Sequence, residues 1–356
     1  MKSVVKTVPQ LDGLEPYDPK YLPAEALLSA NESPYDISPE LRAEIAQAVA
    51  AVPFNRYPDP LANELRDMIA QANGLTRDQV LLGNGGDELL FDVALAYGCA
   101  SRKMINITPT FSVYALNARL NNTEVVDIPR KVDLSIDEEA VLARAAEGDI
   151  SYIVVTSPNN PTGAVVSHDF VDRLLNATDA LVLLDEAYGE FAGETCLDLL
   201  KQHENLLILH TFSKAYSLAG VRLGYLLGSE AVIREFIKFR QPYSVDAVSQ
   251  AIAKVVYAHR DEFLENAREL AQAAQDLAAA LEKMPQVQAV YPTDANFVLF
   301  KVDRADLVWQ MLYDQGVLVR DFSRCPGIEG CLRVTAGTSE ENLKFLDALE
   351  NALRAR

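Results

Sequence analysis

The sequence predicts an α/β protein with a large, mostly parallel sheet wrapped by helices, a smaller C-terminal α/β domain and an N-terminal arm. Short apolar segments rich in leucine or β-branched residues alternate with helical stretches over most of the chain, which is typical of successive βαβ units. After Pro285 the pattern of apolar segments changes, which indicates a second domain. The 356 residues with 49% hydrophobic content are sufficient for two cores.

The expected domains are an arm at 1–35, a large domain at 36–260 and a small domain at 261–356. The arm is rich in proline, tyrosine and turn residues. In the large domain we expect strands at 80–82, 103–107, 124–128, 150–156, 180–184, 206–209 and 222–227, and helices at 41–52, 87–97 and 111–120.

An alanine-rich stretch at 244–283 is expected to form a long helix that spans the two domains. The small domain follows it. We expect its strands at 296–300, 317–320 and 331–335, and its helices at 306–315 and from 339 onward.

Composition excludes several classes of protein. A net charge of -19 repels nucleic acid and anionic membranes, so neither is an expected partner. The four cysteines form no C-x-x-C pair and the four histidines have no metal-ligand spacing, so no metal site is expected. The N-terminus has no signal-peptide pattern and no apolar run approaches the length of a membrane span. We therefore expect a cytoplasmic protein with reduced thiols.

A lysine stands just beyond the end of an apolar strand. The run at 206–209 is typical of a buried parallel strand, and Lys214 follows it among small residues. Such a lysine can form a Schiff base with an aldehyde cofactor, and the nearby Arg222 offers a planar fork suited to a phosphate. The alternative is a surface lysine in a loop, with Arg222 in an ordinary ion pair.

This segment resembles a known motif. Residues 213–225, with the pattern S-K-x-x-x-L-A-G-x-R-x-G, resemble the cofactor-lysine segment of fold-type-I aminotransferases, which use pyridoxal 5'-phosphate (PLP). The resemblance implies the fold-type-I architecture. It also implies that Lys214 carries PLP and acts as the catalytic base and acid, while Ser213 and Arg222 help to hold the cofactor phosphate.

Two further strand ends carry polar residues that suit this cofactor. Asp185 can pair with the protonated pyridine nitrogen, although an N-cap aspartate is the alternative reading. Tyr188 can bond the cofactor phenolate, or be a core tyrosine. Asn160 lies in 157–163, which resembles the N-P-x-G segment of the superfamily and would otherwise be only a turn.

A glycine cluster between a strand and a helix suits the cofactor phosphate. The backbone N–H groups of Gly85, Gly86 and Asp87 should form an anion site at the helix N-terminus. Phe111 could stack on the pyridine ring, with a core phenylalanine as the alternative. Ligands of open α/β sheets bind at the carboxyl ends of the strands, where these residues are expected.

Within this class the chain resembles the histidinol-phosphate aminotransferase family most closely. The resemblance rests on residues 14–17, 31–35, 55–60, 316–321 and 332–338. It implies that the enzyme converts L-histidinol phosphate and 2-oxoglutarate to imidazole acetol phosphate and L-glutamate. It implies a homodimer in which Tyr57 reaches the partner's PLP phosphate, and a substrate-anion site formed by Arg333 and Arg320 with help from Tyr17.

Some observations leave alternatives open. Gly86 stands where the family usually has serine or alanine, and Phe111 where tyrosine is common. Aromatic aminotransferases and threonine-phosphate decarboxylases share most of these motifs. A PLP-binding regulator would carry a basic helix-turn-helix domain, whereas this N-terminal segment is short, proline-rich and not basic. Without the resemblance, Arg320 and Arg333 would be interpreted as solvated charges at strand edges.

Overall fold

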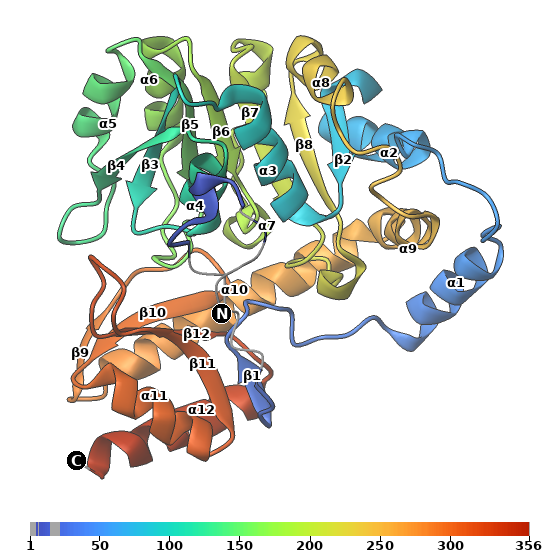
Figure 1. The fold of residues 1–356 in the computed structure, drawn as a ribbon. Coiled ribbons are helices and arrows are strands. Elements are labelled where there is room, and N and C mark those ends of the chain that lie inside the picture. The colour runs from blue at the N-terminus through green and yellow to red at the C-terminus, as the bar shows by residue number, and fades with distance from the viewer. Residues whose placement is uncertain (1–4, 6, 15–21, 356) are drawn as a thin grey trace.

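The structure is a computed structural model that describes residues 5, 7–14 and 22–355. Two α/β domains lie one above the other, and helix α10 (Arg260–Glu282) passes from one to the other (Figure 1). This confirms the predicted fold class. Tyr17, expected at the substrate site, lies outside the described residues.

Within residues 22–355 the large domain has a seven-stranded sheet in the order β2-β8-β7-β6-β5-β3-β4. Strand β8 is antiparallel to both of its neighbours, and the other pairs are parallel. The strands are β2 (Val80–Gly83), β3 (Lys103–Thr108), β4 (Glu124–Pro129), β5 (Ile150–Thr156), β6 (Leu181–Asp185), β7 (Leu206–Thr211) and β8 (Gly224–Gly228).

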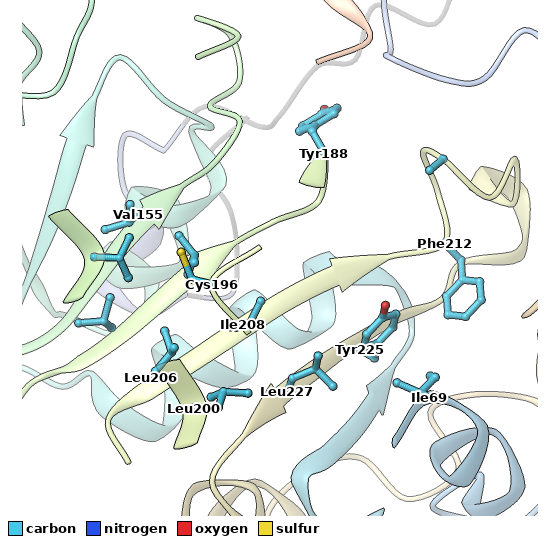
Figure 2. Packing of buried hydrophobic residues seen from close by; sticks show 14 of the residues in the cluster. Ile69, Val155, Tyr188, Cys196, Leu200, Leu206, Ile208, Phe212, Tyr225 and Leu227 are labelled. Carbon is cyan, nitrogen blue, oxygen red and sulfur yellow. The ribbon is translucent and has the colours of Figure 1, made fainter. Parts of the chain in front are cut away.

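The central strands are mainly apolar because both faces of the sheet are covered. Successive side chains of a strand point to opposite faces, so Leu206 and Ile208 of β7 join one core while Leu207 joins the other. Figure 2 shows Ile208 with Tyr225 of β8 in the first core. Helices α3, α4 and α8 contribute buried side chains to the second core, and α2, α5, α6, α9 and the first half of α10 contribute to the first.

Helix starts follow local sequence signals. Ser38, Ser167 and Ser229 each accept a hydrogen bond from a backbone N–H in the first turn that follows. The helices of the large domain are α1 (Pro39–Ala50), α2 (Asn63–Asn73), α3 (Gly85–Tyr97), α4 (Val113–Leu120), α5 (Glu138–Ala145), α6 (His168–Ala177), α7 (Gly189–Ala192), α8 (Glu230–Ile237) and α9 (Ala247–Ala258).

The small domain has, within the described residues, a five-stranded sheet in the order β1-β11-β12-β10-β9. Strand β1 comes from the segment expected to be an arm and pairs in parallel with β11. The elements are β1 (Ala26–Leu28), β9 (Val287–Val290), β10 (Phe297–Val302), α11 (Ala305–Asp314), β11 (Val317–Phe322), β12 (Cys331–Thr335) and α12 (Ser339–Arg354).

The prediction of one long helix over 244–283 is wrong. The structure has two helices, α9 and α10, which are separated at His259, where the backbone leaves the helical conformation. The break lets α9 pack on α1 and α2 while α10 continues to the small domain. The buried residues of α10 divide accordingly: Phe263 and Leu270 belong to the large core, and Leu277 and Leu281 to the small one.

In the described part of the chain, no helix is long and apolar enough to cross a membrane. Among the described residues, no group of His, Cys, Asp and Glu is arranged to hold a metal ion. All four cysteines are described, and each is a free thiol.

Candidate active site

A cavity of about 670 Å³ lies between the two domains and is lined by the carboxyl ends of β5, β6 and β7. It brings together most of the residues singled out from the sequence. Those that line it are Gly86, Asp87, Phe111, Asn160, Asp185, Tyr188, Ser213, Lys214, Arg222, Arg320 and Arg333.

The expected Tyr57 does not line this cavity. Its side chain is 81% exposed, and its ring stacks on Tyr243 with the ring centroids 4.5 Å apart. Gly85 lies beside the cavity, in contact with Arg222.

Lys214 follows β7 and reaches across to the N-terminal segment. Its Nζ donates a hydrogen bond of 2.8 Å to the carbonyl oxygen of Ala30 and lies 5.8 Å from the ring centroid of Tyr188. Burial, assisted by the charge of Arg333, lowers the pKa of Lys214 to about 8. An amine with this pKa is uncharged, and therefore nucleophilic, in a substantial fraction of molecules at mildly alkaline pH.

Asp185 is the last residue of β6 and is 4% exposed. Its Oδ2 accepts a hydrogen bond of 2.6 Å from the hydroxyl of Tyr114, and its Oδ1 accepts one of 2.9 Å from the N–H of Ala187. Burial raises the pKa of the Asp185 carboxyl, and both hydrogen bonds act in the opposite direction.

The hydroxyl of Tyr188 is held by a residue of the N-terminal segment. The Nδ2 of Asn31 donates to the Tyr188 hydroxyl at 2.9 Å, and the Oδ1 of Asn31 accepts from the hydroxyl of Thr335 at 3.0 Å. Asn31 has a φ of 55°, in the left-handed region that asparagine tolerates better than most residues. Because the Tyr188 oxygen accepts from Asn31, its own proton is available to a ligand in the cavity.

Arg222 and the start of α3 form a cradle for an anion. Arg222 donates to Ser213 Oγ at 3.2 Å and pairs with Asp87 at 3.0 Å. Gly85 has a φ of 78°, which strains any residue with a side chain, and a Cβ there would lie 2.6 Å from the Arg222 guanidinium in its present position. At Gly86 a Cβ would meet its nearest neighbour, Leu209, at 3.6 Å, so this position has room for the serine or alanine usual in the family.

Arg222 itself was expected to begin a strand, and this prediction is wrong. Its φ of 57° is left-handed, it ends the short turn Ala219–Val221, and β8 begins only at Gly224. The turn directs the guanidinium toward α3 rather than along the sheet.

The two arginines of the small domain lie on neighbouring antiparallel strands. Arg320 of β11 is directly opposite Arg333 of β12. Arg333 is 4% exposed, donates to the carbonyl oxygen of Ser29 at 2.6 Å and hydrogen-bonds the side-chain oxygen of Asn160. Its guanidinium lies over the ring of Phe297, 5.1 Å from the centroid. Like charges directly opposite one another are destabilising, so this pair favours an anion between them.

The donor set fits PLP. It has a primary amine at one side of the cavity, a carboxylate in the buried interior, and a helix N-terminus with an arginine at the cradle of Gly85. These groups match an aldehyde, a pyridine nitrogen and a phosphate, respectively.

Three polar residues at the site were missed in the sequence. Tyr114 lies only three residues after Phe111, in the first turn of α4, and the two rings meet edge to face. Asn31 was noted only as part of a family segment, and Thr335 likewise. Their contact joins residues 304 positions apart, and no local pattern reports it.

Comparisons with known proteins identify the family of the chain. The family model for aminotransferase class I and II matches residues 25–349. The chain is 40% identical to a histidinol-phosphate aminotransferase of Thermococcus kodakarensis over 324 residues, 91% of each chain. It is 34% identical to one of Desulfitobacterium hafniense over 351 residues, 97% of each chain.

Solved structures have the same fold. The histidinol-phosphate aminotransferase of Sinorhizobium meliloti in complex with pyridoxal-5'-phosphate superposes with a TM-score of 0.89 at 24% identity, covering 99% of each chain. The L-threonine-O-3-phosphate decarboxylase of Porphyromonas gingivalis has a TM-score of 0.81 at 26% identity, covering 92% of this chain and 99% of its own.

Proposed function

Because the chain belongs to the aminotransferase class I and II family, we propose that it transfers the amino group of L-histidinol phosphate to 2-oxoglutarate. The products are imidazole acetol phosphate and L-glutamate. The relatives that share 34–40% identity over nearly the whole chain support this substrate, since they are histidinol-phosphate aminotransferases. The cofactor is PLP, as in the family.

The observation that carries the proposal is the cross-strand pair of Arg320 and Arg333, which opens on the same cavity as Lys214. Both substrates are anions, a phosphate ester in one half-reaction and a dicarboxylate in the other. An arginine fork can take either group with two parallel hydrogen bonds. In a chain of net charge -19, such local positive charges offset the repulsion that an anion otherwise meets.

Bound PLP supplies an aldehyde carbon for the substrate amine and a pyridine ring that accepts electron density. In our proposal, Ser213, Arg222 and the N-terminus of α3 bind its phosphate. Asp185 keeps a proton on the pyridine nitrogen, and Phe111 stacks on the ring. Tyr188 and Asn160 bond the phenolate oxygen.

Lys214 would hold the cofactor through its amine and would move a proton at the substrate Cα. Its lowered pKa suits both tasks, because the amine must be uncharged to attack and to take a proton. Arg333 and Arg320 hold the substrate anion and thereby orient the Cα–H bond toward Lys214.

A second candidate activity is decarboxylation of a phosphorylated amino acid, which the similarity to the Porphyromonas decarboxylase favours. Product analysis separates the possibilities. Purified enzyme is given histidinol phosphate, phenylalanine or O-phosphothreonine with 2-oxoglutarate. Glutamate formed fastest from histidinol phosphate supports the proposal. Carbon dioxide release from O-phosphothreonine, or faster reaction with phenylalanine, would replace it with one of the alternatives.

We also propose that the enzyme is a cytoplasmic homodimer in which Tyr57 acts on the partner's site. Its exposed ring and its absence from the cavity of its own chain support an action across an interface. Mixing Tyr57→Phe with Lys214→Ala chains tests this. In a mixed dimer one site then carries both changes and the other is intact, so activity should reappear in about a quarter of all sites. No recovery after verified subunit exchange contradicts the arrangement.

A further inference from the structure

At the buried wall of the cavity, the side chain of Asp185 accepts a hydrogen bond from the hydroxyl of Tyr114. Tyr114 lies on α4, is 4% exposed, and places its Oη 2.6 Å from Asp185 Oδ2. Its ring meets that of Phe111 edge to face, with the centroids 5.6 Å apart. One turn of α4 and the residues before it thus provide both an aromatic face and a hydroxyl to the same cavity.

A second hydrogen bond, from Thr156 to Tyr114, fixes the direction of the bond between Tyr114 and Asp185. Thr156, at the end of β5, donates from its Oγ1 to the Tyr114 oxygen at 3.0 Å. The phenol oxygen therefore accepts from Thr156 and uses its single proton toward Asp185. An ionised carboxylate can only accept, so this proton stabilises the charged form of Asp185.

The hydroxyl of Tyr114 matters because the influences on the pKa of Asp185 oppose one another. The carboxylate is buried, which favours the neutral acid, and the Tyr114 hydrogen bond is the largest influence that lowers the pKa, ahead of the Ala187 N–H and the charge of His210. Burial, reinforced by the charge of Asp185, raises the pKa of Tyr114 well above its ordinary value. The phenol therefore remains protonated and remains a donor over the working pH range.

We propose that Tyr114 is a positioning residue that holds Asp185 ionised and correctly oriented, so that Asp185 can keep the pyridine nitrogen of the cofactor protonated. Thr156 donates to the phenol oxygen on the side away from Asp185. The Oγ1 of Thr110 lies 3.4 Å from the Oγ1 of Thr156 and donates to the Oδ1 of Asn159 at 2.7 Å. This connects the Asp185 end of the cavity to the loop that carries Asn160. The inference rests on the cofactor part of the proposed function and is independent of the amino donor.

The matched test compares two buried tyrosines. Tyr114→Phe removes the hydroxyl and keeps the ring. Tyr152→Phe is the control, because Tyr152 is 2% exposed in the same core cluster and its hydroxyl has no hydrogen-bond partner in the described part of the chain. The variants are loaded with PLP labelled with ¹⁵N at the ring nitrogen, and the nitrogen chemical shift is measured over a pH range. PLP dissociation constants are measured in parallel.

In Tyr114→Phe the ring-nitrogen signal should move toward the unprotonated position. PLP should bind roughly 10- to 100-fold more weakly, and kcat should fall by a similar factor with little change in KM, because a hydrogen bond to a charged group is lost. Tyr152→Phe should match the wild type. Thr156→Val, which removes only the supporting donor, should shift the nitrogen signal in the same direction by less, and it provides the test if Tyr114→Phe does not fold.

A folded Tyr114→Phe with the nitrogen signal and PLP affinity of the wild type would overturn the inference, and so would equal shifts in Tyr114→Phe and Tyr152→Phe. If the wild-type protein binds no PLP, the proposed function fails as well. If histidinol phosphate is not a substrate but the nitrogen signal still depends on Tyr114, only the substrate assignment fails.

Discussion

The inner wall of the cavity and the seam between the domains are built in different ways. The inner wall is Asp185 with Tyr114. The seam is Lys214 and Arg333 with the segment 29–31, whose carbonyl oxygens they bind. The inner-wall contact joins residues 71 positions apart within one domain, whereas the seam contacts join residues 184 and 304 positions apart.

This difference separates two tasks. The inner wall belongs to a single buried sheet and its covering helices, so it is formed whenever the large domain folds. The seam exists only when the N-terminal segment and both domains meet. We therefore expect changes at the seam to affect chemistry and substrate binding while the inner wall keeps its geometry. Changes behind Asp185 should affect cofactor binding and kcat while substrate binding at the seam stays nearly the same.

The largest effect is expected from Lys214→Ala. Loss of the amine removes both the attachment point and the group that moves the proton, so turnover should fall by at least roughly 10³-fold. PLP should still bind noncovalently, because the inner wall and the Gly85 cradle remain. Borohydride reduction followed by peptide mapping should label Lys214 in the wild type.

Lys201→Ala, which changes an exposed lysine, serves as the control and should behave as the wild type. Label on a lysine other than Lys214 would refute the assignment.

Arg333→Ala should produce the next largest effect. Removing a charge-assisted, two-pronged contact costs about 2–4 kcal/mol, or roughly 30- to 1000-fold in kcat/KM. Arg333→Lys should recover only part of this, because an ammonium lacks the planar fork. The loss should appear in both half-reactions, measured separately. For Arg320→Ala it should be larger with histidinol phosphate than with glutamate.

The ring-nitrogen signal of bound PLP should be unchanged in Arg333→Ala if seam and inner wall are independent. Equal rates for histidinol with and without its phosphate would remove the substrate assignment and leave the aminotransferase family intact.

The inner wall was largely accessible from the sequence, and the seam was not. The strands that end at Asp185 and before Lys214 are continuous apolar runs, which local pattern identifies well. Tyr114 could have been found from its closeness in sequence to Phe111, which it follows by three residues. Parallel strands then bring their carboxyl ends to one edge, so the grouping of these residues follows from the fold class.

The seam depends on register and on long-range pairing. Arg320 and Arg333 looked like surface charges without the family resemblance, because the pairing of β11 with β12 that places them opposite each other has no local signal. The same holds for Asn31, whose position follows from β1 joining the small sheet.

The division into domains at 36 and 261 remains a prediction. The structure places β1 in the small sheet and lets α10 serve both cores.

Thr335→Val sharpens the comparison with a smaller change at the seam. It removes the hydroxyl that holds Asn31, which in turn holds the Tyr188 hydroxyl. The buried N–H of Asn31 also loses its acceptor, so the free energy of unfolding should fall by about 1–3 kcal/mol. We expect kcat to fall by roughly 3- to 10-fold through a less well-oriented Tyr188, with PLP affinity nearly unchanged.

Thr123→Val is a suitable control, because Thr123 is 3% exposed and its hydroxyl has no partner among the described residues. If Thr335→Val loses stability but keeps the wild-type kcat, the Asn31 contact is purely structural.

The smallest expected effect is a shift in the pH dependence of cofactor attachment, which tests how Arg333 influences Lys214 within the seam. The pKa of Lys214 is lowered from 10.5 to about 8, by burial first and by the charge of Arg333 second. Only the uncharged amine attacks an aldehyde, so the rate of covalent PLP attachment to the apoenzyme should rise with pH and level off above about 8.

Replacing Arg333 by glutamine removes a positive charge that disfavours the protonated amine. The midpoint should therefore move to higher pH, and the shift should shrink as added salt screens the charge in the wild type. Asp185→Asn, a change in the inner wall, should weaken PLP binding and leave the midpoint almost in place, because the main influences on Lys214 are burial and other charges, those of Arg333 and Glu32 first. Stopped-flow absorbance after mixing apoenzyme with PLP gives the rate at each pH. A midpoint near 10.5 in the wild type, or one that does not move in Arg333→Gln, would show that burial and the neighbouring guanidinium do not set the charge of this lysine.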